Sequence, residues 1–526
     1  MVEALQSLAV QYVFGIPGIH NLELYRGLSG ASLQHVSARH EQGLGFMADG
    51  YARVSGRPGV CWTITGPGLT NIATALGQAY GDSIPVLLIA TQNRRGEAGS
   101  GRGFLHELPD QLGLARGLTA ASHAVDAPGQ LPAALTAAFD LFNSGRPRPV
   151  YIEIPRDVLA QEASGLPLPR PTAAPPRAEA QALAAAAALL REAQRPVVLA
   201  GGGARRAAAG LRALVERLGA PLVMTTNARG LLPPGHALAV PASPSLPAVR
   251  ALIANADLVL AVGTELGPTD YDMYSVSEFP APHRLIRIDI DAQQLSRNAT
   301  ACIGLCAEAS EALQGLLQLD LGGTAERAGA GATAAAAAYR AARLALPEPS
   351  RRHLQLLEVM REALPEALMV GDSTQLVYAG NLGVAAATPG SWFNSATGYG
   401  TLGYGLPAAL GAGLAAPARP VICLTGDGGL QFVLGELAVA RELDAWLVIV
   451  VWNNQGYGEI RAAMLAAGIA PRGVDVLSPQ LRRLAAAYGH GYRFIDSREA
   501  LRRALRGFAR RRQVLLLELS AADLER

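Results

Sequence analysis

Two short polar segments follow neighbouring apolar runs in the last third of the chain. Asp427 stands in a Gly-Asp-Gly-Gly segment directly after the run 420–425, and Asn454 stands in Asn-Asn-Gln-Gly-Tyr after the run 446–451. Each run has the length and branched composition of a buried strand, and the residues between them predict a helix. Because the strands of a βαβ unit are parallel, we expect the carboxylate and the amide to meet at one sheet edge.

The residue types at this edge favour a magnesium ion that holds a diphosphate. Oxygen ligands of which few are charged suit Mg²⁺ better than Zn²⁺ or an all-protein Ca²⁺ cage. Glycines beside both segments leave backbone N–H groups free to approach an anion. Either segment alone is explained as well by an ordinary turn or loop, but the two together at matched strand ends favour the metal site.

The spacing of the two segments resembles a family fingerprint. Gly426-Asp427-Gly428, then 24 residues, then Asn453-Asn454 is similar to the thiamine diphosphate (ThDP) fingerprint. The resemblance covers nearly the whole chain and is to the acetolactate synthase, benzoylformate decarboxylase and pyruvate decarboxylase family. It implies that the metal ligands are Asp427, the Asn454 side chain and the Gly456 carbonyl, and that the diphosphate is lined by Gly428, Gly429 and Tyr457.

The pyrimidine end of such a cofactor needs a carboxylate, and Glu41 fits this role. A carboxylate with a raised pKa at ring N1′ promotes the imino tautomer that takes the thiazolium C2 proton. Glu41 begins a predicted helix with apolar neighbours, although glutamate is also common at exposed helix starts. The stretch 40–53 resembles the family's stretch, which implies the catalytic role. The resemblance also places Leu402, otherwise an ordinary core residue, under the bent cofactor, with the Gly400 carbonyl on the pyrimidine amino group.

Glu41 and Asp427 belong to different predicted domains, yet both must touch one cofactor. In the family they come from different subunits. The resemblance therefore implies a homodimer or a dimer of dimers, a homotetramer, with each active site across a subunit interface.

The substrate-facing positions depart from the best-known family members. The two histidines of benzoylformate decarboxylase correspond here to Ile64 or Thr65 and, roughly, to Asp270. No His-His dipeptide of the pyruvate decarboxylase kind occurs, and the tryptophan of acetolactate synthases is missing near Ala463. The missing tryptophan weakens the prediction of acetolactate synthesis.

Two polar segments replace those residues. Segment 101–111 contains His106, and segment 263–272 contains three acids, which favour a cationic substrate group. Together with segment 457–460, both resemble 5-guanidino-2-oxopentanoate (2-ketoarginine) decarboxylases. The resemblance implies that His106, or Asp270, faces the substrate and relays protons. A loop hydrogen bond by His106 and a solvated acidic loop explain the same residues without catalysis.

The pattern of apolar runs predicts an α/β protein with three doubly wound parallel-sheet domains. We expect a pyrimidine-binding domain at 1–165, a middle domain at 181–320 and a diphosphate-binding domain at 349–526. The proline- and alanine-rich residues 161–180 and the Gly-, Ala- and Arg-rich residues 321–348 are predicted to be linkers.

The middle domain carries one glycine turn, Gly201-Gly202-Gly203, after its first predicted strand. The turn lacks the G-x-G-x-x-G spacing of a dinucleotide site and is weak support for one. In the family this domain holds FAD in some members and a nucleotide or nothing in others, so bound FAD is the less favoured expectation here.

Composition excludes several chemistries. All 45 basic residues of the 526 are arginines, so neither a lysine Schiff base nor a Walker lysine can form. A net charge of +2 does not indicate a nucleic-acid or membrane surface. The chain start has no basic segment typical of a signal peptide, and no apolar run predicts a membrane span, so we expect a cytoplasmic protein. The four cysteines are predicted to be reduced core residues: Cys61, Cys302, Cys306 and Cys423.

The predicted function is the Mg²⁺- and ThDP-dependent decarboxylation of a 2-keto acid to an aldehyde and CO₂, with 5-guanidino-2-oxopentanoate as the preferred substrate. One alternative is an acetolactate synthase-like carboligase. Another is a nucleotide-binding regulatory protein that keeps the fold, against which Glu41, Asp427 and Asn454 argue. A NAD-dependent dehydrogenase is disfavoured because its fingerprint is absent.

Overall fold

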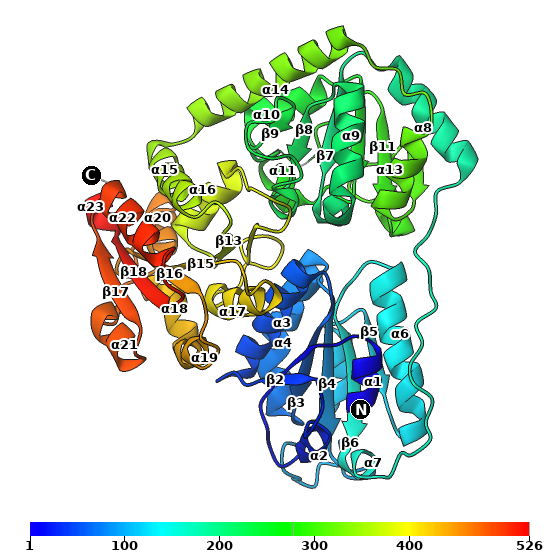
Figure 1. The fold of residues 1–526 in the computed structure, drawn as a ribbon, viewed down its shortest axis with the longest axis vertical. Helices are drawn as coiled ribbons and strands as arrows, with labels where there is room; N and C mark the ends of the chain where they lie inside the picture. Colours follow the sequence, from blue (N-terminus) through cyan, green and yellow to red (C-terminus); the bar gives the residue numbers. More distant parts are fainter. Residues whose placement is uncertain (277, 525–526) are drawn as a thin grey trace. The chain divides into compact units, whose positions relative to one another are not determined.

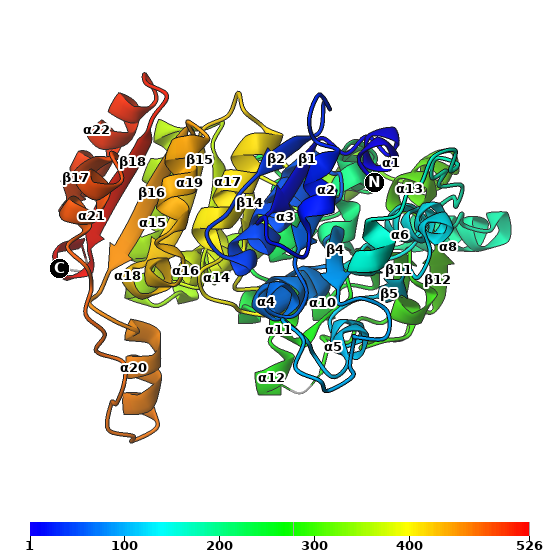
Figure 2. The same ribbon diagram turned by 90° about the horizontal axis from the view of Figure 1, so that it is seen from below.

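The computed structural model describes residues 1–276 and 278–524 and contains three six-stranded sheets flanked by helices (Figures 1 and 2). The strands within each sheet are parallel. Parallel sheets need both faces covered, which explains why most strands are continuous apolar runs rather than alternating ones. The predicted α/β class with three doubly wound parallel sheets is therefore confirmed.

The first sheet has the strand order β2-β1-β3-β4-β6-β5. Its strands are β1 (Tyr12–Gly15), β2 (Gln34–Val36), β3 (Gly59–Thr63), β4 (Val86–Gln92), β5 (Ala121–Ala124) and β6 (Val150–Pro155). Its helices are α1 (Val2–Ser7), α2 (Leu22–Arg26), α3 (Glu41–Ser55), α4 (Pro67–Asp82), α5 (Gln111–Arg116), α6 (Leu131–Ser144) and α7 (Arg156–Leu159). The central strands β3, β4 and β6 are buried along their whole length.

The second sheet has the strand order β12-β11-β10-β7-β8-β9. Its strands are β7 (Pro196–Ala200), β8 (Leu222–Met224), β9 (Ala239–Val240), β10 (Leu258–Val262), β11 (Leu285–Asp289) and β12 (Ile303–Cys306). The helices of this part of the chain are α8 (Ala180–Glu192), α9 (Ala208–Leu218), α10 (Pro247–Ala254), α11 (Pro268–Tyr271), α12 (Met273–Val276), α13 (Ala309–Leu317), α14 (Ala325–Ala345), α15 (Glu348–Ala363) and α16 (Gln375–Gly383).

The third sheet has the strand order β14-β13-β15-β16-β18-β17. Its strands are β13 (Leu368–Gly371), β14 (Trp392–Asn394), β15 (Val421–Gly426), β16 (Leu447–Asn453), β17 (Gly491–Ile495) and β18 (Val514–Ser520). Its helices are α17 (Gly405–Ala415), α18 (Asp427–Leu430), α19 (Glu436–Glu442), α20 (Gly458–Ala466), α21 (Leu481–Ala487), α22 (Arg498–Phe508) and α23 (Ala521–Leu524).

The chain divides into two compact units. Unit 1 consists of residues 1–174, 368–374 and 394–524, and unit 2 consists of residues 175–367 and 375–393. Unit 1 therefore contains the first sheet and the third sheet apart from the start of β14. Unit 2 contains the second sheet.

The second predicted linker is wrong, because residues 325–345 form the helix α14. Alanine has the highest intrinsic helix propensity, so an alanine-rich segment folds as a helix once one face can be buried. The buried face of α14 consists of small residues: Gly331, Ala335, Ala338 and Ala342. Residues 160–179, by contrast, contain no helix or strand, as predicted for the first linker. Within residues 1–276 and 278–524, no helix, α14 included, has the length and hydrophobicity to cross a bilayer.

Two predicted helix starts and the burial of the cysteines also need correction. The sequence pattern predicts a helix that begins near Asn71, but helix α4 begins at Pro67. The helix predicted from Leu430 to about Arg441 begins instead at Asp427 and is broken into α18, a 3₁₀ turn and α19. All four cysteines are free, but Cys302 is exposed, so the prediction of a core position is wrong for it.

Helices α3 and α17 of unit 1 pack with their backbones unusually close. A Cβ atom on Gly50 of α3 would overlap the carbonyl of Ala408, and one on Gly411 of α17 would overlap the carbonyl of Met47. Glycine is needed at both positions, because any side chain there would separate the helices. This contact places the segment before α17 beside the helix that Glu41 begins.

Candidate active site

Asp427 and the segment after β16 meet at the carboxyl edge of the third sheet. Strands β15 and β16 pair in parallel, with Gly426 opposite Trp452. The Asp427 carboxylate accepts hydrogen bonds from the backbone N–H of Asn454 at 3.4 Å and of Gly456 at 3.1 Å. Burial raises the pKa of Asp427, and these backbone N–H groups oppose that shift.

The donor set at this edge fits a magnesium ion with a bound diphosphate. In the described residues, no group of three or more His, Cys, Asp or Glu side chains is arranged to hold a metal. A metal between Asp427, Asn454 and Gly456 would meet one carboxylate and two neutral oxygens. Mg²⁺ uses such sparse protein ligation when substrate phosphates complete its shell.

The residues expected to line the diphosphate lie together. A Cβ atom on Gly428 would stand 2.7 Å from Cε1 of Tyr457, so the tyrosine ring lies against the glycine backbone. A Cβ on Gly429 would stand 3.3 Å from carboxylate oxygen Oδ2 of Asp372 and from the Thr425 hydroxyl. Larger residues at either glycine would push these neighbours away.

Glu41 is the first residue of α3. Nδ1 of His40 caps the helix by accepting from the Gln42 N–H at 3.1 Å, which fixes the first turn. The Glu41 carboxylate is half-buried and accepts a hydrogen bond from the side chain of Asn71 at 3.0 Å. Sequence reasoning missed Asn71, because its contact with Glu41 depends on how α4 packs on α3.

The segment that contains Gly400 and Leu402 also lies beside the start of α3. Gly400 has a φ of +76°, and a Cβ atom there would meet nothing within 4 Å. Its carbonyl has no hydrogen-bond partner among the described residues. The Leu402 carbonyl accepts from the Gln42 side chain at 3.4 Å. The open space at Gly400 and its unused carbonyl fit a ligand with an amino group.

Asp372 links the separate pieces of this edge, and sequence reasoning gave it no role. Its side chain is fully buried and accepts hydrogen bonds from the N–H groups of Ser373 at 2.8 Å and Gly403 at 3.0 Å. The Thr425 hydroxyl lies 3.4 Å away. Burial raises the pKa of Asp372 to about 6. The signal available in the sequence was its place in a Gly-Asp segment directly after a strand.

His106 pairs in space with a histidine that sequence reasoning overlooked. The ring centroids of His106 and His20 are 4.8 Å apart, and His106 has a left-handed φ of +63°. His20 is only 3% exposed, and neither of its ring nitrogens has a partner among the described residues. Burial, followed by the charges of Arg156 and His106, lowers the pKa of His20 to about 4. The fold thus brings together two histidines that lie far apart in the sequence.

Asp270 lies in unit 2, as the third residue of α11, and is half-buried. Its approach to His106 and Glu41 of unit 1 stays a prediction. The acids beside it, Glu265 and Asp272, have polar or electrostatic partners of their own, as has Asp270. The nearby glycine turn has a packing role, because Gly201 and Gly203 lie against the backbone of Gly263.

Comparison with known proteins identifies the family. Residues 1–114 match the thiamine pyrophosphate enzyme N-terminal TPP binding domain, residues 183–316 the central domain, and residues 372–519 the C-terminal TPP binding domain. The chain therefore belongs to the thiamine pyrophosphate enzyme family, and the resemblance seen in the sequence is confirmed.

Individual relatives span most of the chain. The chain is 46% identical to the probable 2-ketoarginine decarboxylase AruI of Pseudomonas aeruginosa, over 99% of this chain and 93% of the relative. It is 32% identical to the acetolactate synthase isozyme 1 large subunit of Escherichia coli, over 87% of this chain and 81% of the relative. It is also 32% identical to the acetolactate synthase large subunit IlvB1 of Mycobacterium tuberculosis, over 88% of this chain and 76% of the relative.

Proposed function

We propose that this protein is a Mg²⁺- and ThDP-dependent decarboxylase that converts 5-guanidino-2-oxopentanoate into the corresponding aldehyde and CO₂. The observation that carries the proposal is the meeting of Asp427 with the Asn454–Gly456 segment in a chain of the thiamine pyrophosphate enzyme family. The substrate is supported by the 46% identity to a relative named a probable 2-ketoarginine decarboxylase.

In this proposal the third sheet holds the charged end of the cofactor. Asp427, the Asn454 side chain and the Gly456 carbonyl bind Mg²⁺, while Gly428, Gly429 and Tyr457 line the diphosphate. The Gly400 carbonyl would accept a hydrogen bond from the pyrimidine amino group, and the Leu402 side chain would support the cofactor. When bound, ThDP supplies the carbon nucleophile and the electron sink that a chain without lysine cannot supply itself.

Proton movements are assigned to two residues of unit 1. Glu41 holds a proton at pyrimidine N1′, and Asn71 keeps its carboxylate oriented through the 3.0 Å hydrogen bond. His106 delivers the proton that the product carbon needs after CO₂ leaves. His20 lies beside it, and because burial lowers the pKa of His20 to about 4, this neighbour adds no positive charge next to His106 near neutral pH.

Substrate selection and assembly complete the proposal. The acidic segment of Glu265, Asp270 and Asp272 is assigned to the guanidinium end of the substrate, because carboxylates bind guanidinium through charge-assisted hydrogen bonds. Asp270 is the less favoured second candidate for proton relay. We propose a homodimer or a dimer of dimers, in which Glu41 of one subunit serves the cofactor bound by its partner.

A product assay tests the proposal. Purified protein with ThDP and Mg²⁺ is given 5-guanidino-2-oxopentanoate, pyruvate, benzoylformate and 2-oxoisovalerate separately, and aldehyde, CO₂ and carbon–carbon bonded products are measured. We expect aldehyde and CO₂ in equal amounts from the guanidino acid. Turnover of pyruvate but not of the guanidino acid would refute the proposed substrate. A carbon–carbon bonded product with little free aldehyde would instead support the carboligase that the 32% identical relatives suggest.

A further inference from the structure

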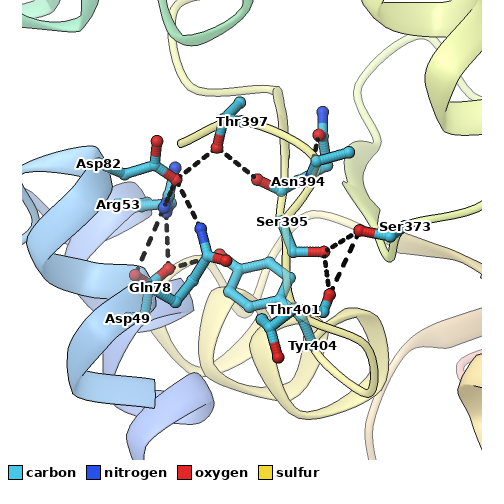
Figure 3. Close-up of polar contacts among 11 residues, drawn as sticks. Asp49, Arg53, Gln78, Asp82, Ser373, Asn394, Ser395, Thr397, Thr401 and Tyr404 are labelled. Atoms are coloured by element: carbon cyan, nitrogen blue, oxygen red, sulfur yellow. Dashed lines mark hydrogen bonds and ion pairs between the residues drawn. The ribbon is translucent and has the colours of Figure 1, made fainter. Parts of the chain in front are cut away.

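Two buried carboxylates of unit 1 share one arginine at the interface between α3 and α4 (Figure 3). Nε of Arg53 lies 2.6 Å from Asp49, and its Nη2 lies 2.6 Å from Asp82. The exposed fraction of the side chain is 1% for Arg53, 0% for Asp49 and 3% for Asp82. Two carboxylates against one guanidinium leave oxygen atoms that need further donors, because buried acceptors without partners are costly.

The missing donors come from the segment before α17. The Thr397 hydroxyl donates to Asp82 at 2.7 Å, and the Tyr404 hydroxyl donates to Asp49 (Figure 3). Gln78 of α4 adds a hydrogen bond to Asp82 at 2.9 Å. Arg53, its two carboxylate partners and the segment before α17 therefore form one buried polar network, in which each hydrogen bond strengthens its neighbours.

Thr397 and Tyr404 stand on either side of Gly400 and Leu402. Between them, the Thr401 carbonyl accepts from the hydroxyl of Ser395 at 2.7 Å and of Ser373 at 3.3 Å. The ring of Tyr399 lies against α4, where a Cβ atom on Gly77 would stand 2.6 Å from it. The segment is thus held at both ends and in its middle. The Gly400 carbonyl stays without a partner among the described residues.

We propose that Thr397 and Tyr404 are positioning residues, whose bonds to Asp82 and Asp49 hold Gly400 and Leu402 ready for the pyrimidine end of ThDP. The inference rests on the proposed function. Asp49 lies on α3 and Asp82 on α4, so these two helices fix the place of the segment that carries Gly400 and Leu402. Preorganisation of this kind raises affinity by removing the cost of ordering the segment on binding.

Removing single hydroxyl groups tests this role. In Thr397→Val and Tyr404→Phe, we expect the dissociation constant of ThDP, titrated calorimetrically in the presence of Mg²⁺, to rise about tenfold each. The near-ultraviolet circular dichroism of the bound cofactor should change as well. At saturating ThDP, KM for the 2-keto acid should stay within about twofold, because the segment is assigned to the cofactor and not to the substrate.

Matched controls separate positioning from lost stability. Thr119→Val removes a buried hydroxyl that bonds to Ala115 and Ser122, and Tyr25→Phe removes a buried hydroxyl without a partner in the described structure. Both should bind ThDP like the wild type. Thr397→Ser keeps the hydroxyl and should restore the affinity that Thr397→Val loses.

Each outcome decides between the proposals. If Thr397→Val binds ThDP as tightly as Thr119→Val and shows the same dichroism, the positioning role is overturned. That result would leave the proposed function intact, because the wild type would still bind the cofactor. If the wild type itself binds no ThDP, the proposed function fails first. Should Tyr404→Phe not fold, the comparison of Thr397→Val with Thr397→Ser still gives the answer.

Discussion

The ring of His20 lies 4.8 Å from the ring of His106, although one residue follows β1 and the other follows β4. Both strands are parallel members of the first sheet, so their carboxyl ends lie at one edge. His20 is buried and His106 is half-buried. The pair therefore presents one imidazole at the sheet edge with a second behind it.

Replacing His106 should slow the chemical step without loosening the cofactor. General acid catalysis typically contributes 10²- to 10⁴-fold, so we expect His106→Gln to lower kcat for the guanidino acid by about 10²-fold. The dissociation constant of ThDP should be unchanged. His283→Gln, which alters an exposed histidine of unit 2, is the control. A kcat equal to that of the control would remove His106 from the proton relay.

His20 should make the protein less stable at acid pH. Its pKa is lowered from 6.5 to about 4, so between these values the unfolded chain binds more protons than the folded one. The free energy of unfolding therefore falls as the pH drops from 6.5 towards 4. In His20→Asn this decline should be shallower, measured by urea unfolding at pH 7 and pH 5. Equal declines in both proteins would show that His20 is not held neutral.

Glu436 should make the protein less stable as the pH rises, which is the opposite of the effect of His20. It is 1% exposed, accepts from the Arg39 N–H at 3.0 Å, and burial raises its pKa from 4.5 to about 7. The folded state binds more protons in this range, so stability is lost as the pH rises through 7. We expect the free energy of unfolding of Glu436→Gln to rise relative to that of the wild type between pH 5 and pH 8, by an amount on the order of 3 kcal/mol at most. A pH-independent difference would contradict this.

The metal site should depend on a single carboxylate. Asp427→Asn should weaken binding of ThDP with Mg²⁺ by at least about a hundredfold, since even outer-shell partners of metals cost up to that factor. Chelation of Mg²⁺ should abolish turnover in the wild type, and added Mg²⁺ should restore it. Asp444→Asn, at an exposed residue just after α19, should bind normally. Tight ThDP binding by Asp427→Asn would refute the assignment.

Local signals were enough to predict the sheets and the meeting of Asp427 with Asn454. Buried parallel strands are continuous apolar runs. Residues that directly follow adjacent parallel strands lie at the same edge of the sheet, whatever the conformation of the loops. The chemical roles of those residues stay predictions. The resemblance to the family, which rested on the same spacing, is confirmed by the three matched domains.

Contacts between distant segments could not be predicted in this way. The bond of Asn71 to Glu41 depends on how α4 lies on α3, and the bond of Thr397 to Asp82 depends on a segment far along the chain. Neither residue type is unusual where it stands. The error at α14 has another cause, because an alanine-rich segment suits a linker or a helix until burial decides between them.

The proposed role of Glu41 in activating the cofactor is tested by the exchange of the C2 proton of bound ThDP with deuterium. The rate is measured by NMR after quenching, for the wild type and for Glu41→Gln, with calorimetry showing that both bind ThDP and Mg²⁺. We expect the variant to bind the cofactor but to exchange this proton about 10²- to 10⁴-fold more slowly, and to release no CO₂ from the guanidino acid. Equal exchange rates and undiminished CO₂ release would contradict the role of Glu41 in proton transfer at the cofactor.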